Sequence, residues 1–174
     1  MRMQILWASA AAAALAACSN TPSSPQPQAS ASLQPLVNSG VTGTVKLQQQ
    51  PDGRVLISAL VYGLKPSAKH GFHIHENPSC QDNGDAAGPH FNPLQNTHGA
   101  YSTTHHHAGD LPNLQADSQG IAQLNVLSQG LSLTTGTHNA VGRAFVIHAQ
   151  ADDYNSQPNG NSGTRIACGV ITSP

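Results

Sequence analysis

The stretch Val41–Tyr62 reads VTGTVKLQQQPDGRVLISALVY, and its pattern decides the class of fold. Apolar or small residues recur at every second position in two runs: Val41, Gly43, Val45 and Leu47, then Val55, Ile57, Ala59 and Val61. A period of two places such side chains on one face of a β-strand. Pro51-Asp52-Gly53, between the runs, is a turn signal. The stretch therefore predicts a β-hairpin with one buried face.

Further short strands are expected downstream, at Gly71–His75, Gly120–Leu127, Ala144–His148 and Arg165–Thr172. Beyond the N-terminal apolar run, no window has the period of an amphipathic helix. Short strands separated by Gly, Pro and Asn turns indicate an all-β sandwich or barrel. Two connecting segments are unusually long, Asn77–Leu114 and Ala149–Gly163. Loops of such length are typically functional, and these two contain or flank nearly all of the histidines.

The N-terminus is typical of an export signal. Met1–Ala17 has one charge, Arg2, and an apolar run shorter than the about 20 residues that a membrane-spanning helix needs. Leu15-Ala16-Ala17-Cys18 resembles the bacterial lipobox, in which the cysteine becomes the lipidated first residue. An ordinary signal peptide cleaved after an alanine is the alternative. Ser19 rather than Asp follows the cysteine, which favours an anchor in the outer membrane, facing the periplasm.

The segment after the lipobox has a different composition. Residues 18–35 are rich in Ser, Pro, Gln and Ala and carry no charge, so they predict a flexible tether. Residues 36–174 remain as one domain, long enough to bury a full core.

Charge and cysteine usage narrow the partners. Without Arg2 the chain has eight acidic residues and six basic ones, a net charge near −2, and no basic patch that would bind nucleic acid. With Cys18 assigned to the lipobox, Cys80 and Cys168 form one pair in an exported chain, so a disulfide between them is expected.

The ten histidines are the unusual feature of the composition. His73 and His75 are two apart in an expected strand, so their side chains share a face and can bind one metal. His148 ends another strand and can supply a third imidazole. The long loop adds three imidazoles and a carboxylate: His90, His98, His107 and Asp110. Three imidazoles with one carboxylate suit tetrahedral zinc, whereas an all-imidazole set suits copper.

Taken together, the motifs resemble the copper,zinc superoxide dismutase family from about Val41 to Ile171. The residues that carry the resemblance are Gly71-Phe72-His73-Ile74-His75-Glu76, Gly88-Pro89-His90-Phe91-Asn92-Pro93, His98-Gly99, His107-Ala108-Gly109-Asp110-Leu111, Val146-Ile147-His148 and Arg165-Ile166-Ala167-Cys168-Gly169-Val170. The resemblance implies a Greek-key β-barrel. It also implies an enzyme that converts two superoxide anions and two protons to O₂ and hydrogen peroxide as copper cycles between Cu(II) and Cu(I).

The resemblance assigns a role to each site residue. Copper would bind to His73, His75, His90 and His148, and zinc to His90, His98, His107 and Asp110, with His90 bridging. Asp152 would link a copper histidine to a zinc histidine, and Arg165 would hold the anion beside copper. Cys80 and Cys168 match the family's internal disulfide.

Some residues depart from the family or lie outside its motifs. Ala149–Thr164 contains no lysine, so electrostatic steering of superoxide is expected to be weak. Asp82-Asn83-Gly84-Asp85 is interpreted as a solvated turn in preference to a calcium site. Spacing selects His107 from the triple run, and the other histidines without an assigned role are expected to be structural or exposed: His70, His105, His106 and His138.

Three classes of function fit an exported domain with these residues. The first is the dismutase, and the second is a copper store or chaperone on the same fold. The third is a structural envelope domain, which the complete ligand set argues against. Degenerate relatives usually lose ligands or the arginine, so the complete set favours the enzyme. The chain is expected to be a monomer or a homodimer, and a monomer is favoured.

Overall fold

The computed structural model describes residues 24–174. The predicted signal peptide, residues 1–17, and the proposed lipidation site at Cys18 lie outside this part of the chain. Among the described residues, no helix has both the length and the apolar character needed to cross a membrane.

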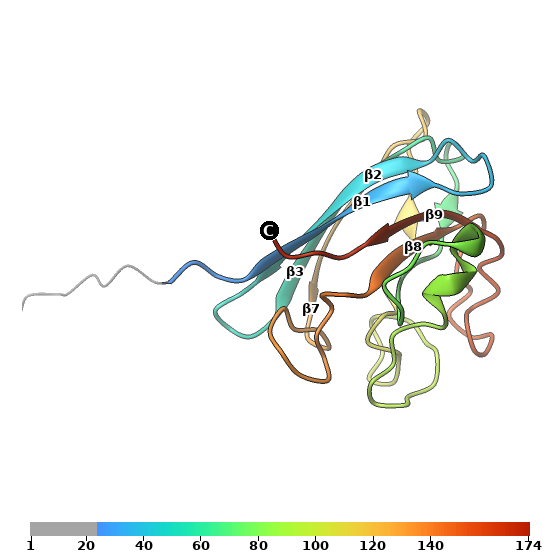
Figure 1. Cartoon of the computed structure of the whole chain (residues 1–174). Coiled ribbons are helices and arrows are strands. Elements are labelled where there is room, and N and C mark those ends of the chain that lie inside the picture. Colours follow the sequence, from blue (N-terminus) through green and yellow to red (C-terminus); the bar gives the residue numbers. More distant parts are fainter. Residues whose placement is uncertain (1–23) are drawn as a thin grey trace, which may run out of the picture.

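The chain forms a curled, seven-stranded antiparallel sheet with the order β5-β8-β9-β1-β2-β3-β7 (Figure 1). The bounds of these strands are β1 Gln28–Pro35, β2 Thr42–Gln49, β3 Val55–Tyr62, β5 Phe72–His75, β7 Ala122–Ser128, β8 Ala144–His148 and β9 Arg165–Val170. A small second sheet pairs β4 (Lys69–His70) with β6 (Leu114–Gln115), and one short 3-10 helix, η1, spans Asp82–Ala87. Strand β9 returns beside β1 after the chain has crossed from β7 to β8, which is a Greek-key connection. The all-β prediction is confirmed.

The hairpin predicted at Val41–Tyr62 is β2–β3. Its strands pair in register from Thr42 with Tyr62 to Gln49 with Val55. The alternating face of β3 is almost fully buried, and Val45 and Leu47 of β2 lie beside it on the same inner face of the sheet, paired with Ala59 and Ile57. Gly53, with φ +88°, allows the chain to reverse between the strands. The period-two pattern therefore identified both the strands and their inner faces.

The tether prediction is wrong for residues 28–35. These residues form β1, which pairs with β2 over its first six residues and with β9 over its last two. Its inner face buries Ala29, Ala31 and Leu33. The composition suggested a linker because small and polar residues dominate it, but the same segment alternates in burial at every second position. The folded domain therefore begins before residue 36.

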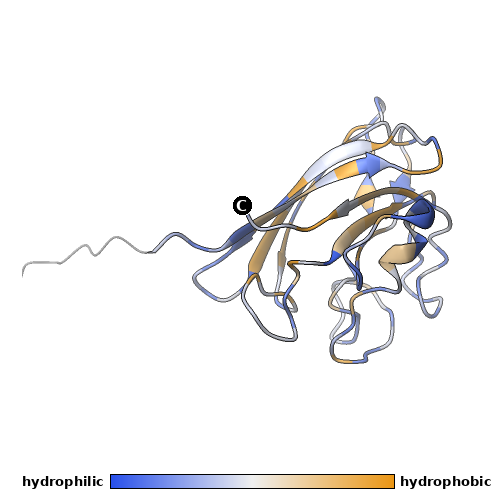
Figure 2. Ribbon diagram, viewed as in Figure 1, coloured by the Kyte–Doolittle hydropathy of each residue, from blue (hydrophilic) through white to orange (hydrophobic). Residues whose placement is uncertain are grey.

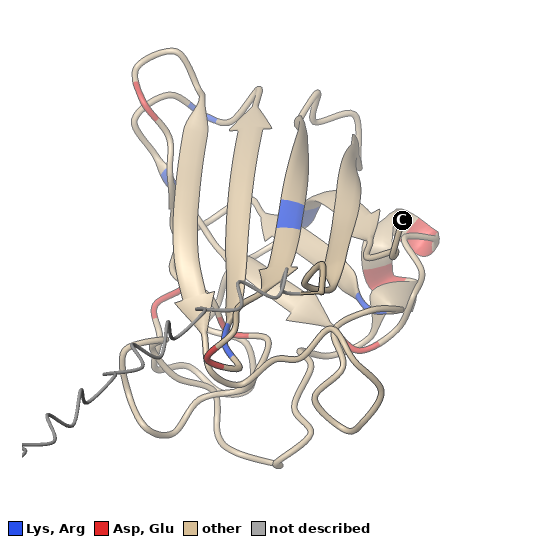
Figure 3. Cartoon of the chain, turned by 90° about the vertical axis from the view of Figure 1, so that its left-hand side faces the viewer, with Lys and Arg blue, Asp and Glu red and all other residues tan. Residues whose placement is uncertain are grey.

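The barrel is apolar inside and weakly charged outside. In Figure 2 strands such as β8 are mostly apolar in colour, whereas β1 and β2 alternate between polar and apolar residues and the connecting segments are largely polar. Phe72, Phe145, Ile57 and Leu33 are among the largest fully buried side chains. Lys46 is the one charged residue in the broad wall of β1, β2, β3 and β7, and most charges in Figure 3 lie in turns and loops. This rigid wall supports the histidine-bearing loops on the opposite side of the sheet.

Candidate metal centre

Strand β5 divides its side chains between the core and the loops. Phe72 and Ile74 are fully buried in the hydrophobic core, and His73 and His75 point to the other face. As an edge strand of the sheet, β5 leaves backbone groups for the long loop. Ile74 N–H donates to Gly109 O at 2.9 Å, and Phe91 N–H donates to Ile74 O at 2.8 Å. These bonds position the neighbouring loop residues, so that Asp110 lies opposite His73 and His90 lies opposite His75.

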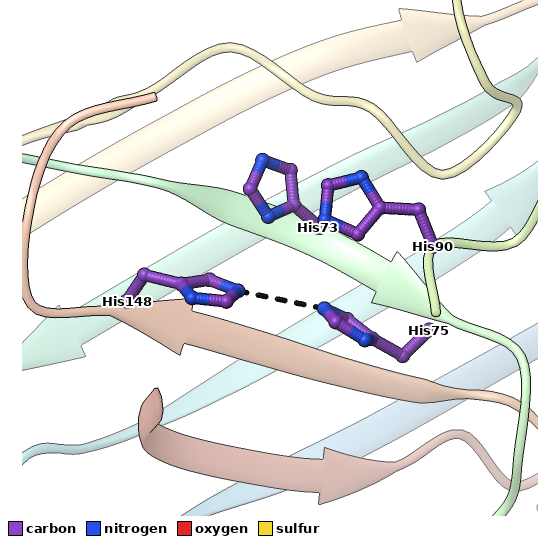
Figure 4. Close-up of side chains that lie close together, drawn as sticks. All are labelled: His73, His75, His90 and His148. Carbon is purple, nitrogen blue, oxygen red and sulfur yellow. Dashed lines mark hydrogen bonds between the residues drawn. The ribbon is translucent and has the colours of Figure 1, made fainter. Parts of the chain in front are cut away.

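A first cluster contains four buried imidazoles, His73, His75, His90 and His148 (Figure 4). One nitrogen from each lies within 4.8 Å of the nitrogens of the others. The Nε2 atoms of His75 and His148 are 3.4 Å apart, and the ring centroids of His73 and His90 are 4.0 Å apart. Because the ligands come from β5, β8 and the long loop, the folded barrel is required to assemble them.

The other nitrogen of each imidazole in this cluster faces a protein oxygen. His73 Nε2–H donates to Asp152 Oδ2 at 2.8 Å, His75 Nδ1–H to Gly88 O at 2.8 Å, and His148 Nδ1–H to Gly163 O at 3.0 Å. His90 Nδ1 lies 2.8 Å from Asp110 Oδ1. Such contacts fix the ring orientation and the tautomer, so that each remaining nitrogen presents a lone pair.

A second cluster surrounds the carboxylate of Asp110. The Nδ1 atoms of His90, His98 and His107 lie 2.8, 3.1 and 3.2 Å from Asp110 Oδ1. The other carboxylate oxygen, Oδ2, accepts from the backbone N–H groups of Gly99 and His107. His90 belongs to both clusters, with one ring nitrogen directed to each.

Asp152 connects the two clusters through their outer nitrogens. Its Oδ2 accepts from His73 of the first cluster at 2.8 Å, and its Oδ1 accepts from His98 of the second at 2.9 Å. The side chain of Asn113 binds both backbone polar groups of Asp152. The link predicted from the resemblance is therefore present geometrically, with its backbone held from a separate loop.

Two observations indicate that the residues of these clusters can bind metal ions. Two buried nitrogens that face the first cluster have no hydrogen-bond partner among residues 24–174: His73 Nδ1 and His90 Nε2. Unpartnered buried polar atoms are costly and need an explanation. Ligands about 2.0–2.1 Å from a tetrahedral zinc ion are about 3.3–3.4 Å apart. The atoms around Asp110 approach one another at 2.8 to 3.5 Å, which is close to that spacing.

The protonation states also favour metal binding. Burial lowers the pKa of His73 to about 3 and that of His148 to about 4, so both are neutral at neutral pH. Burial opposes ionisation of Asp110, but the histidines hydrogen-bonded to it hold its pKa well below its usual range. Burial also opposes the charged form of His98, but the carboxylates of Asp110 and Asp152 raise its pKa to about 9. A metal at the second cluster would therefore displace a proton from His98.

An arginine and an open cleft adjoin the first cluster. The cleft, of about 770 Å³, is lined by His75, His90, His148 and Arg165, among other residues. The guanidinium of Arg165 donates from Nη1 to Gly84 O at 2.5 Å and from Nη2 to Gly88 O at 2.8 Å. Solvent-borne ligands can thus meet a fixed cation and the imidazoles in one place.

The comparisons with known proteins agree with this arrangement. The family model described as copper/zinc superoxide dismutase matches residues 41–171. The chain belongs to the copper/zinc superoxide dismutase family. A solved structure similar to it is the double mutant of a SOD-like protein from Bacillus subtilis, in which a tyrosine and a proline are each replaced by histidine. The two are 39% identical, the match covers 82% of this chain and 96% of that one, and the TM-score is 0.75.

Within this superoxide dismutase fold, the predicted residues come together as the family resemblance implied. The seven expected ligands fall into two clusters that share His90, and Asp152 and Arg165 adjoin them. A disulfide joins Cys80 to Cys168, across 88 residues of sequence. His70 is buried and donates from Nδ1 to His148 O, which agrees with a structural role. His105, His106 and His138 lie outside both clusters, and His105 is exposed.

Three supporting residues were not predicted from the sequence. Asn113 holds the backbone of Asp152, and Gln157 holds the backbone of His98. At Gly160 a Cβ atom would lie 1.8 Å from Asp152 Oδ1, so only glycine fits beside that carboxylate. Asn113 lies three residues after Asp110, and its closeness to that predicted ligand could have drawn attention to it. Gln157 and Gly160 lie in a polar loop without such a signal.

Proposed function

We propose that this protein is a superoxide dismutase that converts two superoxide anions and two protons to one O₂ and one hydrogen peroxide. The observation that carries the proposal is the complete set of buried ligands with oriented ring nitrogens, next to a cleft that contains Arg165. A store or chaperone would have no need for Arg165 at the ligand cluster. Membership of the family and the likeness to a SOD-like protein support the same activity.

We assign the all-imidazole cluster to copper and the cluster with Asp110 to zinc. Neutral imidazoles suit copper, and three imidazoles with one carboxylate suit tetrahedral zinc. Bound copper would supply one-electron redox chemistry, with zinc as a charge that does not change oxidation state. His73, His75 and His148 would remain on copper, with their outer nitrogens hydrogen-bonded to protein oxygens. Asp152 would keep the two ligand sets in a fixed relation.

Two residues of the cleft would bind the substrate and transfer a proton. Arg165 would bind the superoxide anion, because its guanidinium is a permanent cation that two backbone carbonyls hold in place. His90 lines the same cleft, and its Nε2 atom is buried without a partner in the described chain. That atom is suited to hold a proton and deliver it to the reduced product.

The test combines metal analysis with a superoxide assay on the purified protein. We expect about one copper and one zinc per chain, together with dismutase activity. His148→Ala is expected to remove copper and activity while zinc stays bound, because His148 belongs to the first cluster alone. Full metal loading without activity would instead favour the store.

We also propose that the enzyme is a lipoprotein of the bacterial envelope, anchored through Cys18 in the outer membrane and facing the periplasm. The lipobox at Leu15–Cys18 and the disulfide between Cys80 and Cys168 support export to an oxidising compartment. Cys18→Ser should move the protein from the membrane fraction to the soluble fraction. Unchanged partitioning into membranes would contradict the anchor.

A further inference from the structure

The cleft beside the first cluster contains a carboxylate that no catalytic role explains. Apart from histidines, Arg165 and Asp85 are the two residues lining it that carry a formal charge. Asp85 Oδ1 lies 3.8 Å from Arg165 Nε, and its side chain is 84% exposed. An exposed pair at this distance contributes little to stability. Its position at the mouth of an anion-binding cleft therefore calls for another explanation.

The same short helix positions both the carboxylate and the arginine. Gly84 O of η1 accepts from Arg165 Nη1, and Asp85 is the next residue. Asn83 and Gly84 both have positive φ, +53° and +87°. A Cβ at Gly84 would meet Leu36 Cδ1 at 2.8 Å and Arg165 Cδ at 3.2 Å. This tight turn places Asp85 next to the backbone carbonyl that binds the guanidinium, and its carboxylate lies 3.8 Å from Arg165 Nε.

We infer that Asp85 competes with the incoming anion for Arg165 and so sets the affinity and the ionic-strength dependence of the site. The inference rests on the proposed function, and it names the residue that limits attraction of the anionic substrate. Two of the arginine nitrogens bind backbone carbonyls, and the third faces Asp85, so the local positive charge is opposed on the side of η1. Ala149–Thr164 adds no lysine that would compensate for it.

The opposite role, in which Asp85 orients Arg165 for catalysis, predicts the opposite sign. Loss of an orienting carboxylate would weaken anion binding, whereas loss of a competitor strengthens it. The two backbone carbonyls already hold the guanidinium, which favours competition. A charge about 6 Å away, in a dielectric near that of water, changes anion affinity by about threefold.

The experiment compares Asp85→Asn and Asp85→Lys with Asp82→Asn. Asp82 is the matched control, since it is an exposed acid of the same helix that does not line the cleft. At about 0.01 M ionic strength we expect kcat/KM for superoxide to rise about threefold in Asp85→Asn and about tenfold in Asp85→Lys. Asp82→Asn should stay within about 1.5-fold of wild type, and all four proteins should converge at about 1 M salt.

A second readout does not depend on dismutase activity. The increase in melting temperature with inorganic phosphate, at fixed ionic strength, gives an apparent phosphate Kd for each protein as isolated. Asp85→Asn should bind phosphate about threefold more tightly than Asp82→Asn does. If the wild type has no dismutase activity but Asp85→Asn still binds phosphate more tightly, the proposed function is overturned and the competition at Arg165 is supported. The competition alone would be overturned if the wild type is active but Asp85→Asn does not bind phosphate more tightly than Asp82→Asn and does not have a higher kcat/KM than wild type.

Discussion

The side chain of Gln157 binds the backbone of His98 at both of its polar groups. The amide oxygen accepts from His98 N–H at 2.9 Å, and the amide nitrogen donates to His98 O at 2.8 Å. The two residues are 59 positions apart, in the two different long loops. This contact ties the second loop directly to a proposed zinc ligand.

Replacement of Gln157 by leucine should weaken zinc binding, because the backbone of His98 would lose both side-chain partners. We expect the zinc Kd to rise about tenfold, in the lower part of the range for outer contacts of metal sites. Competition with a chromogenic chelator measures it. Gln123→Leu, an exposed change in β7, is the control. Equal zinc affinity in the two variants would contradict a positioning role for Gln157.

Gly160→Ala should disrupt the Asp152 link. The added Cβ would lie 1.8 Å from Asp152 Oδ1 and 2.7 Å from His98 Nε2, and φ at this position is +65°. Gly142→Ala shares the positive φ, +82°, but its Cβ would meet nothing within 4 Å, so it isolates the backbone cost of about 1–2 kcal/mol. Urea unfolding should show a larger loss for Gly160→Ala, by about 1–3 kcal/mol beyond that control. A loss no larger than that of Gly142→Ala would show that the loop accommodates the methyl group.

The triple histidine run offers a matched test of ligand selection. His107 Nδ1 lies 3.2 Å from Asp110 Oδ1, whereas His105 is exposed and belongs to neither cluster. We expect His107→Ala to lose most of its zinc and His105→Ala to retain about one zinc per chain. Elemental analysis after dialysis against a mild chelator distinguishes them. Zinc retained by His107→Ala would mean that a neighbouring histidine replaces it.

Strand β1 can be tested with adjacent substitutions on its two faces. Ala31 is 2% exposed and faces the core, and Ser30 faces outward. Ala31→Asp should lower the free energy of unfolding by at least about 3 kcal/mol, since it buries an unpaired carboxylate. Ser30→Asp should change it by less than about 0.5 kcal/mol. If both were neutral in chemical denaturation, residues 28–35 would behave as the tether that their composition suggested.

The sequence predicted those parts of the molecule whose signals are local or periodic. The hairpin β2–β3 could be recognised because its alternation is strong and its turn contains Gly53. The ligands lie in short motifs that the family resemblance assigned, and the fold brings them together. His107 was separated from its neighbours by spacing alone, and it is the member of the run in the Asp110 cluster.

The missed features depend on the conformation of long loops or on weak apolar signals. Gln157 contacts His98 only because the second loop folds back over the first, which no periodicity reports. Asp85 was interpreted as part of a solvated turn, and it is exposed, but the turn also holds Arg165. In β1 two of the three buried residues are alanines, so the strand lacks the large apolar side chains that usually mark a core strand.

If Cys18 carries a lipid, the early start of β1 limits how far the domain can reach from the membrane. Nine residues separate Cys18 from Gln28. Even fully extended, they span about 30 Å, roughly the thickness of a bilayer's hydrocarbon core. Figure 1 shows β1 beginning at the end of the barrel opposite the long loops. A lipid on Cys18 would therefore keep the start of β1 within about 30 Å of the bilayer, and it would attach the domain at the end of the barrel that lies away from the long loops.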